Sequence, residues 1–156
     1  MYLLSVYLHV ICATIWIGGQ LFLPLILLPA LKKNITDNQV KKSVIFETGI
    51  IFSKIGRWIL LLFILTGITN FYFKFHTWNM GWLLSTNYGK WLGIKLFLFL
   101  IMAMVNLYHE QKMIRYIKQK ISEAEYKKLR KMASLTGRMT LILSLIILFI
   151  GLYLTK

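Results

Sequence analysis

The chain has 156 residues, of which 58% are hydrophobic, and it carries a formal net charge of +14 at pH 7. This composition excludes an ordinary soluble domain and predicts a small membrane protein that crosses the bilayer several times. The single cysteine excludes an intrachain disulfide and a metal site built from four cysteines.

The first apolar run extends from the N-terminus to the basic pair Lys32–Lys33. It is longer than the roughly 20 residues that a helix needs to cross a bilayer. No basic stretch precedes it, so we expect a retained membrane helix rather than a signal peptide. Pro24 and Pro29 predict a bend or a break near the inner end of this helix.

Four apolar segments are long enough to be crossings, at about residues 1–30, 44–74, 90–112 and 134–155. Backbone polar groups within lipid must be paired inside the segment, so each crossing is expected to be a helix. We therefore predict an all-α fold, a four-helix bundle integral to the membrane, with residues 1–156 forming a single domain.

The basic residues are distributed unevenly between the connections. Six of the 19 lysines and arginines lie within residues 32–57 and nine lie within residues 112–138, and all five acids lie in or beside these two regions. The positive-inside rule then predicts that both regions face the cytoplasm of a bacterial inner membrane and that both termini face the periplasm. Such loops favour anionic lipid headgroups. Nucleic acid is not an expected partner, because no nucleic-acid-binding motif accompanies the charge.

His9 is the main candidate for chemistry, because a histidine inside a membrane helix usually faces the bundle interior. Cys12, Trp16 and Gly19 follow it at helical spacing and lie roughly on the same face. Neutral imidazole suits a copper ligand or an axial heme ligand. A hydrogen bond between helices is the structural alternative, and Gly18–Gly19 can serve either close helix packing or the approach of a flat ligand.

The depth of each residue in the membrane decides which side chains can lie at the same level as His9 and share a site with it. His9 lies about 10 Å below the outer end of its helix and Lys95 about 7 Å below the outer end of the third, whereas His109 lies about 15 Å deeper than His9. Lys95 can therefore share a level with His9, either as a ligand or as a counter-charge. His76 and Met80, in the expected outer loop, are further candidate metal ligands.

Three segments together resemble the CopD family, named for copper resistance protein D. His9–Gly19 is similar to the family's His-x(6)-Trp-x-Gly-Gly opening helix, and Phe52–Arg57 with Leu65–Ile68 is similar to its Phe-Ser start and Thr-Gly end. Thr86–Leu96 is close to its Tyr-Gly-Arg-x-Leu-x-x-Lys-Leu pattern. The resemblance implies an inner-membrane protein of copper transport or resistance, with a metal site in the outer half of the bundle.

Placing histidine in the first helix and lysine in the third is also similar to the membrane protoporphyrinogen oxidase of bacterial heme synthesis. That resemblance implies a heme-b redox protein, with His9 as axial ligand, Lys95 as second ligand or propionate partner, and Trp16 and Gly19 beside the cofactor. After Pro24 the chain departs from that enzyme, because apolar residues stand where the enzyme has arginine and histidine.

The first hypothesis is thus a copper-handling protein rather than an enzyme, with His9 as the main ligand, Cys12, His76 and Met80 as further candidates, and Lys95 tuning the charge. A heme-dependent membrane oxidoreductase is the second, and a non-catalytic membrane subunit is the third. Expected partners are the lipid bilayer, a copper ion or heme, an electron-transfer protein or periplasmic metal carrier, and a second copy of the chain.

Overall fold

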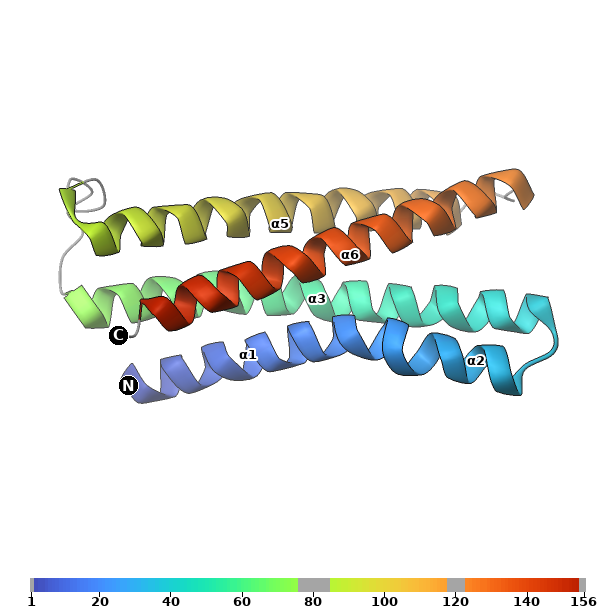
Figure 1. Ribbon diagram of the computed structural model, residues 1–156, viewed down its shortest axis with the longest axis horizontal. Helices are drawn as coiled ribbons and strands as arrows, with labels where there is room; N and C mark the ends of the chain where they lie inside the picture. The colour runs from blue at the N-terminus through green and yellow to red at the C-terminus, as the bar shows by residue number, and fades with distance from the viewer. Residues whose placement is uncertain (1, 76–84, 118–122, 155–156) are drawn as a thin grey trace.

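The computed structural model describes residues 2–75, 85–117 and 123–154, and nearly all of these residues are helical (Figure 1). Four of the described segments are long and apolar enough to cross a membrane, namely Tyr2–Asn34, Asn38–Phe75, Asn87–Lys112 and Lys127–Tyr153. No strand occurs within the described ranges. The predicted all-α fold with four crossing helices is therefore confirmed.

The first crossing stays helical through both of its prolines. Helix α1 (Tyr2–Phe22) is followed by a π-helical turn, η1 (Leu23–Leu27), and then by α2 (Leu28–Asn34). Pro24 and Pro29 each occupy one of the first two positions of these later segments. A proline lacks a backbone donor and clashes with the carbonyl four residues earlier, and a widened turn accommodates both effects without ending the helix.

The other crossings are α3 (Asn38–Phe75), α5 (Asn87–Ile117) and α6 (Glu123–Tyr153). Each is longer than its predicted apolar segment, and α6 begins well before the predicted start at residue 134. The extra residues are charged but are good helix formers, so the helix continues beyond the apolar part. The apolar segments thus predicted where the chain crosses the membrane, whereas the helix propensity of the flanking residues explains why the helices are longer than those segments.

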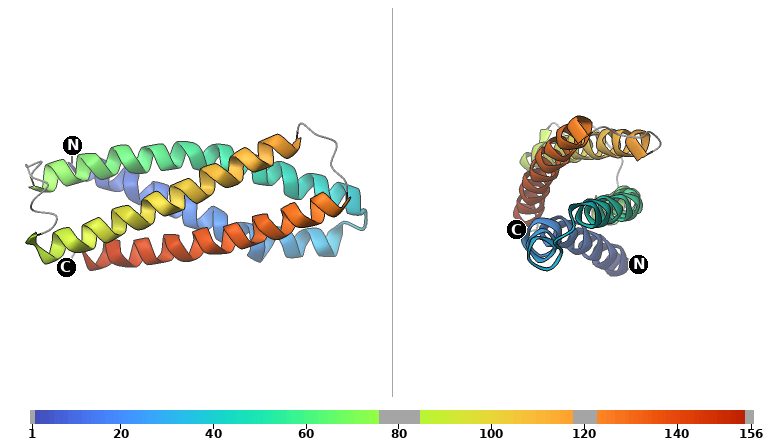
Figure 2. Two further views of the ribbon diagram at one scale, coloured as in Figure 1. Left: turned by 90° about the horizontal axis from the view of Figure 1, so that it is seen from above. Right: turned by 90° about the vertical axis from the view of Figure 1, so that its right-hand side faces the viewer.

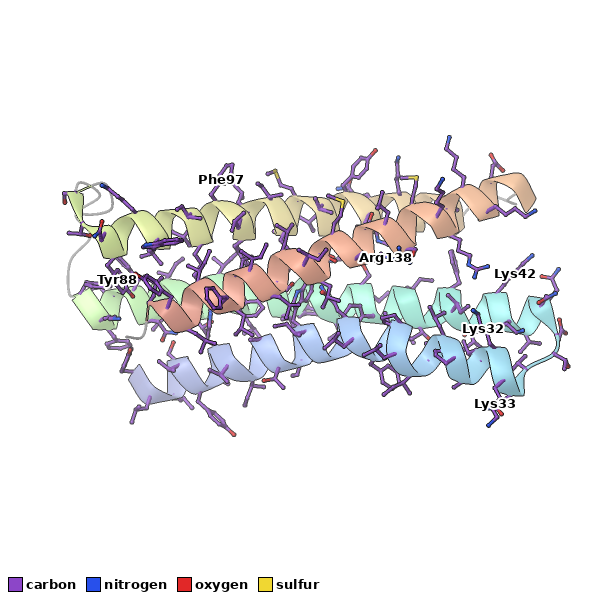
Figure 3. The ribbon with its side chains drawn as sticks, in the orientation of Figure 1. Lys32, Lys33, Lys42, Tyr88, Phe97 and Arg138 are labelled. Atoms are coloured by element: carbon purple, nitrogen blue, oxygen red, sulfur yellow. The ribbon has the colours of Figure 1, made fainter. Side chains whose placement is uncertain are left out.

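The four helices run alongside one another, and the N- and C-termini lie at the same end of the bundle (Figures 1 and 2). We call this the terminal end. Lys32, Lys33 and Lys42 lie at the opposite end, which we call the basic end, far from Tyr88 (Figure 3). Helix α1 packs mainly against α3, and α5 mainly against α6, while smaller interfaces join α1 to α6 and α3 to α5.

Large apolar side chains cover the outside of the bundle, as expected for helices surrounded by lipid. Trp58 is 69% exposed, and Phe97 is 63% exposed and points away from the other helices (Figure 3). The buried core is small by comparison. Its buried residues come from α1, α3 and α5 and are Cys12, Trp16, Ile59, Leu60 and Met102. Partly buried residues, including two from α6, pack around them, namely Ile17, Phe63, Phe99, Ala103, Leu143 and Ile147.

Candidate functional site

One face of α1 brings several polar groups into the interior of the bundle. Ser5, His9, Cys12, Trp16 and Gln20 recur at intervals of three or four residues, so they lie along one side of the helix. His9 is half-buried and the other four are buried. The predicted common face of His9, Cys12 and Trp16 thus points into the bundle, where α3 and α6 approach it.

The His9 ring is fixed by Thr66 of α3. Nδ1 of His9 lies 2.7 Å from Oγ1 of Thr66, and the same hydroxyl lies 2.6 Å from the carbonyl oxygen of Leu62. A carbonyl can only accept, so the hydroxyl donates its one proton to Leu62 and accepts from Nδ1–H of His9. The imidazole is then neutral at Nε2, which keeps a free lone pair.

Two further contacts hold the His9 side chain in place. The ring of Phe63 meets the imidazole edge to face, with 5.0 Å between ring centroids and an interplanar angle of 73°. A Cβ atom added at Gly67 would lie 4.0 Å from Cε1 of His9, so the ring passes directly over this glycine. No hydrogen bond from the described residues reaches Nε2, which leaves it available to a ligand.

Lys95 of α5 lies close enough to His9 to interact with it electrostatically. Its side chain is half-buried, and Nζ lies over Gly151 of α6, 3.2 Å from where a Cβ atom would stand. No carboxylate among the described residues forms an ion pair with Lys95. Lys95 therefore acts on His9 through its charge, from a helix that does not pack directly against α1.

Trp16 connects three helices. It is 3% exposed, Nε1 donates to Oγ of Ser144 in α6 at 2.9 Å, and a Cβ atom at Gly56 of α3 would stand only 2.8 Å from its Cζ3. Its ring also stacks on Phe52, with 6.1 Å between centroids. Helix packing accounts for every contact of Trp16, and only Gly fits at position 56 beneath this ring.

The Phe52 ring also occupies the space beside Gly19. A side chain at Gly19 would collide with this ring. The predicted close approach at Gly19 is therefore made by another helix, and the ring of Phe52 stands where a flat ligand would have to lie. Gly18, in contrast, faces outward with no atom near its missing side chain.

Two sulfur atoms lie in the core next to this network. Cys12 is 5% exposed and Met102 of α5 is 2% exposed, and both belong to the buried cluster around Trp16. Sδ of Met102 lies 3.2 Å from Oγ of Ser144, whose one proton goes to the carbonyl of Thr140 at 2.7 Å. Because Ser144 has a single hydroxyl proton and the sulfur has two lone pairs, the thioether of Met102 keeps at least one lone pair free.

Sequence reasoning did not single out Met102 as a site residue, because Met104 stands beside it in an apolar run. The structure separates the pair, with Met102 buried and Met104 53% exposed. Residues two apart on a helix point to different faces, so only one of them could face the core. The choice between them required the position of α6, which the sequence does not contain.

The remaining predicted ligands are not brought together by the described residues. His76 and Met80 lie outside the described residues. Within residues 2–75, 85–117 and 123–154, no group of three or more His, Cys, Asp or Glu residues comes close enough to hold a metal ion. A metal site in this bundle therefore has to draw on thioether or other soft donors as well.

A charged pair that the sequence did not predict lies nearer the basic end. Arg57 of α3 donates from its guanidinium to the carboxylate of Glu110 in α5. Glu110 is 7% exposed, whereas more than half of the Arg57 side chain is exposed. Arg57 thus reaches toward the surface while also neutralising a buried carboxylate.

These features define a class: a four-helix membrane protein whose interior is lined by imidazole, hydroxyl and sulfur groups. The family model for copper resistance protein D (CopD) matches residues 47–153. Since this match covers more than half of the chain, the protein belongs to the CopD family. The matched part includes Thr66, Lys95 and Met102, whereas His9, Cys12 and Trp16 precede it.

A protein of Aquifex aeolicus (strain VF5), described as an uncharacterized protein, is 31% identical to this chain over 149 residues. The alignment covers 95% of this chain and 91% of the relative. No solved structure matches the chain. The comparisons thus identify a copper-resistance family and a multi-pass membrane protein.

Proposed function

We propose that this protein handles copper as Cu(I) cargo, in transport or in resistance, through a site in the terminal half of the bundle. The observation that carries the proposal is the geometry of His9. Thr66 holds Nδ1, so Nε2 is left as a free donor inside the bundle, and Cys12 follows one turn further along the same face. Membership of the copper-resistance family supports copper as the ion.

The donor set suits this ion. Soft thiolate and thioether donors select Cu(I), and imidazole also suits copper. His9, Cys12 and Met102 supply one donor of each kind. Binding at Cys12 replaces the thiol proton, so the Cu(I)–thiolate unit carries no net charge and costs less to hold in an apolar interior. The Thr66 hydroxyl, which accepts from Nδ1–H of His9, fixes the tautomer and direction of the ring.

Lys95 sets how tightly the ion is held. Its positive charge near His9 disfavours a bound cation, and no carboxylate among the described residues offsets it. An ion that must cross a membrane has to bind well enough to enter and weakly enough to leave. We assign Lys95 this tuning role rather than a role as ligand.

The charge distribution supports an orientation for this path. The basic end carries Lys32, Lys33 and Lys42, and basic loops remain on the cytoplasmic side. The terminal end, and with it His9, then faces the periplasm of a bacterial inner membrane. A periplasmic metal carrier would deliver or collect the ion there, while an electron-transfer partner and a homodimer stay predictions.

Heme b fits this arrangement less well. The ring of Phe52 stands beside Gly19, and Trp16 is committed to Ser144 and Gly56. The residues expected to border a heme therefore pack against other helices instead, and heme is not part of the proposed function. An absorption spectrum of the purified protein tests this directly, because sharp bands after reduction would identify a b-type cytochrome.

Cu(I) flux into vesicles tests the proposal. The purified protein is reconstituted in lipid vesicles, and Cu(I) uptake is compared for wild type, His9→Gln and Met104→Leu. We expect His9→Gln to abolish uptake while the protein still inserts, and Met104→Leu, on the lipid-facing side, to leave it unchanged. Equal uptake by His9→Gln and wild type would overturn the proposed site.

A further inference from the structure

A second histidine, His109 of α5, lies toward the basic end, 14 positions beyond Lys95 in the chain. Along a helix this separation corresponds to about 21 Å. Nε2 of His109 is buried and has no hydrogen-bond partner among the described residues. Buried polar atoms are nearly always paired, so an unpaired imidazole nitrogen calls for an explanation such as an ion or a ligand.

His109 borders a small cavity between α5 and α6. The cavity has a volume of about 30 Å³ and is lined by Tyr108, His109, Lys112, Leu129, Met132 and Thr136. A water molecule needs only about 10–15 Å³, so there is room for a dehydrated ion. An imidazole from one helix and a thioether from the other thus border the same space.

The charges around this cavity disfavour a hard divalent cation. Among the residues that the structure describes, no carboxylate lines it, and Glu110, the next residue after His109, is paired with Arg57 of α3. Lys112 does line the cavity, but its Nζ lies over the ring of Tyr108, 4.7 Å from the ring centroid. Hard cations require oxygen ligands and negative charge, whereas imidazole with thioether suits a soft monovalent ion.

We infer that His109 and Met132 form a second Cu(I) site, nearer the basic end than the His9 site. This inference rests on the proposed function, because copper is the cargo in both. The Lys112 charge makes the second site weak, which suits a position from which the ion is released. The two sites would then lie at different depths, one nearer the terminal end and one nearer the basic end, so that copper could bind on either side of the membrane centre.

Ag(I), a redox-inert substitute for Cu(I), tests the inference. Binding to the detergent-purified full chain is measured by titration against a competing chelator, for wild type, His109→Gln, Met132→Leu and His9→Gln. Met139→Leu is the matched control, because Met139 lies on the same helix as Met132 but is 49% exposed. Thermal unfolding of each variant shows whether it remains folded.

We expect two Ag(I) ions per chain for wild type and for Met139→Leu. His109→Gln should bind one, and Met132→Leu should weaken the second site at least tenfold while His109 stays in place. Wild-type behaviour in both variants would overturn the second site and leave the proposed function standing. Loss in these two variants with no loss in His9→Gln would support the second site and overturn the first. No binding by wild type would overturn both.

Discussion

The terminal half and the basic half of the bundle solve the problem of polar groups in a membrane differently. In the terminal half, Ser5 and His9 both bond to Thr66, and no ion pair is needed. In the basic half, Glu110 is buried and is balanced by an arginine that is more than half exposed. Neutral groups can lie deep when they bond to one another, whereas a carboxylate requires a partner that still reaches water.

Lys95 departs from this pattern, because it is a cation placed in the neutral half. Its Nζ lies over Gly151, a position where a side chain would crowd it, and no carboxylate of the described residues pairs with it. A charge in an apolar segment is costly and is usually functional. Substitutions in the terminal half are therefore the more informative ones, and the basic half provides the contrast.

The largest expected effect is a loss of stability at Trp16, whose side chain contacts both α3 and α6. Trp16→Ala should lower the free energy of unfolding by about 3 kcal/mol, because it leaves a cavity and removes the indole hydrogen bond to Ser144. Trp58→Ala, at a lipid-facing position of α3, is the control and should change stability little. Unfolding in detergent measures both, and equal losses would contradict the packing role.

The second largest effect is expected at the hydrogen bond between Thr66 and His9. Thr66→Val removes the hydroxyl that orients His9, so Cu(I) affinity of the His9 site should fall about 10–100-fold. Thr69→Val is the matched control, because the Thr69 hydroxyl bonds only to Leu65 of its own helix. Competition titration with a Cu(I) chelator gives both affinities. An unchanged affinity in Thr66→Val would show that the ring needs no such support.

A smaller effect of opposite sign is expected at Lys95. Lys95→Gln removes a positive charge near His9 and should tighten Cu(I) binding by up to about tenfold, since like charges repel in a low-dielectric interior. Tighter binding should also slow release in the vesicle assay. Lys90→Gln, at an exposed position near the start of α5, should change neither quantity. Weaker binding in Lys95→Gln would instead identify Lys95 as a ligand.

The smallest effect belongs to the basic half. Glu110→Gln and Arg57→Gln should each lower the melting temperature, and the double variant should lose less than the sum of the two, because the partners contact each other. Glu47→Gln, at an exposed position where the carboxylate only accepts from Ser43, serves as control. Additive losses in the double variant would show that the pair contributes no coupling energy.

The number of crossings, the helical fold and the interior direction of the His9 face all followed from local properties of the sequence. Apolar runs longer than the bilayer is thick give crossings, and a spacing of three or four residues gives a face. The family resemblance was confirmed by the match over residues 47–153, although the match begins after the helix that carries His9.

Other parts of the site could not be predicted in this way, because they depend on which faces of distant helices meet. Ser144 looks like any serine in an apolar run until it receives the Trp16 indole, and Met102 differs from Met104 only in the direction it points. Arg57 and Glu110 are 53 positions apart, and nothing local marks them as partners.

The sequence by itself therefore determined what kind of protein this is: a four-helix membrane bundle with a histidine on its inner face. Those conclusions depend on length, apolarity and periodicity, which act within one helix. The tertiary structure alone decided that Thr66 frees Nε2 of His9, that Met102 joins Cys12 in the core, and that His109 and Met132 share a cavity. These are relations between residues of different helices, and only packing brings such residues side by side.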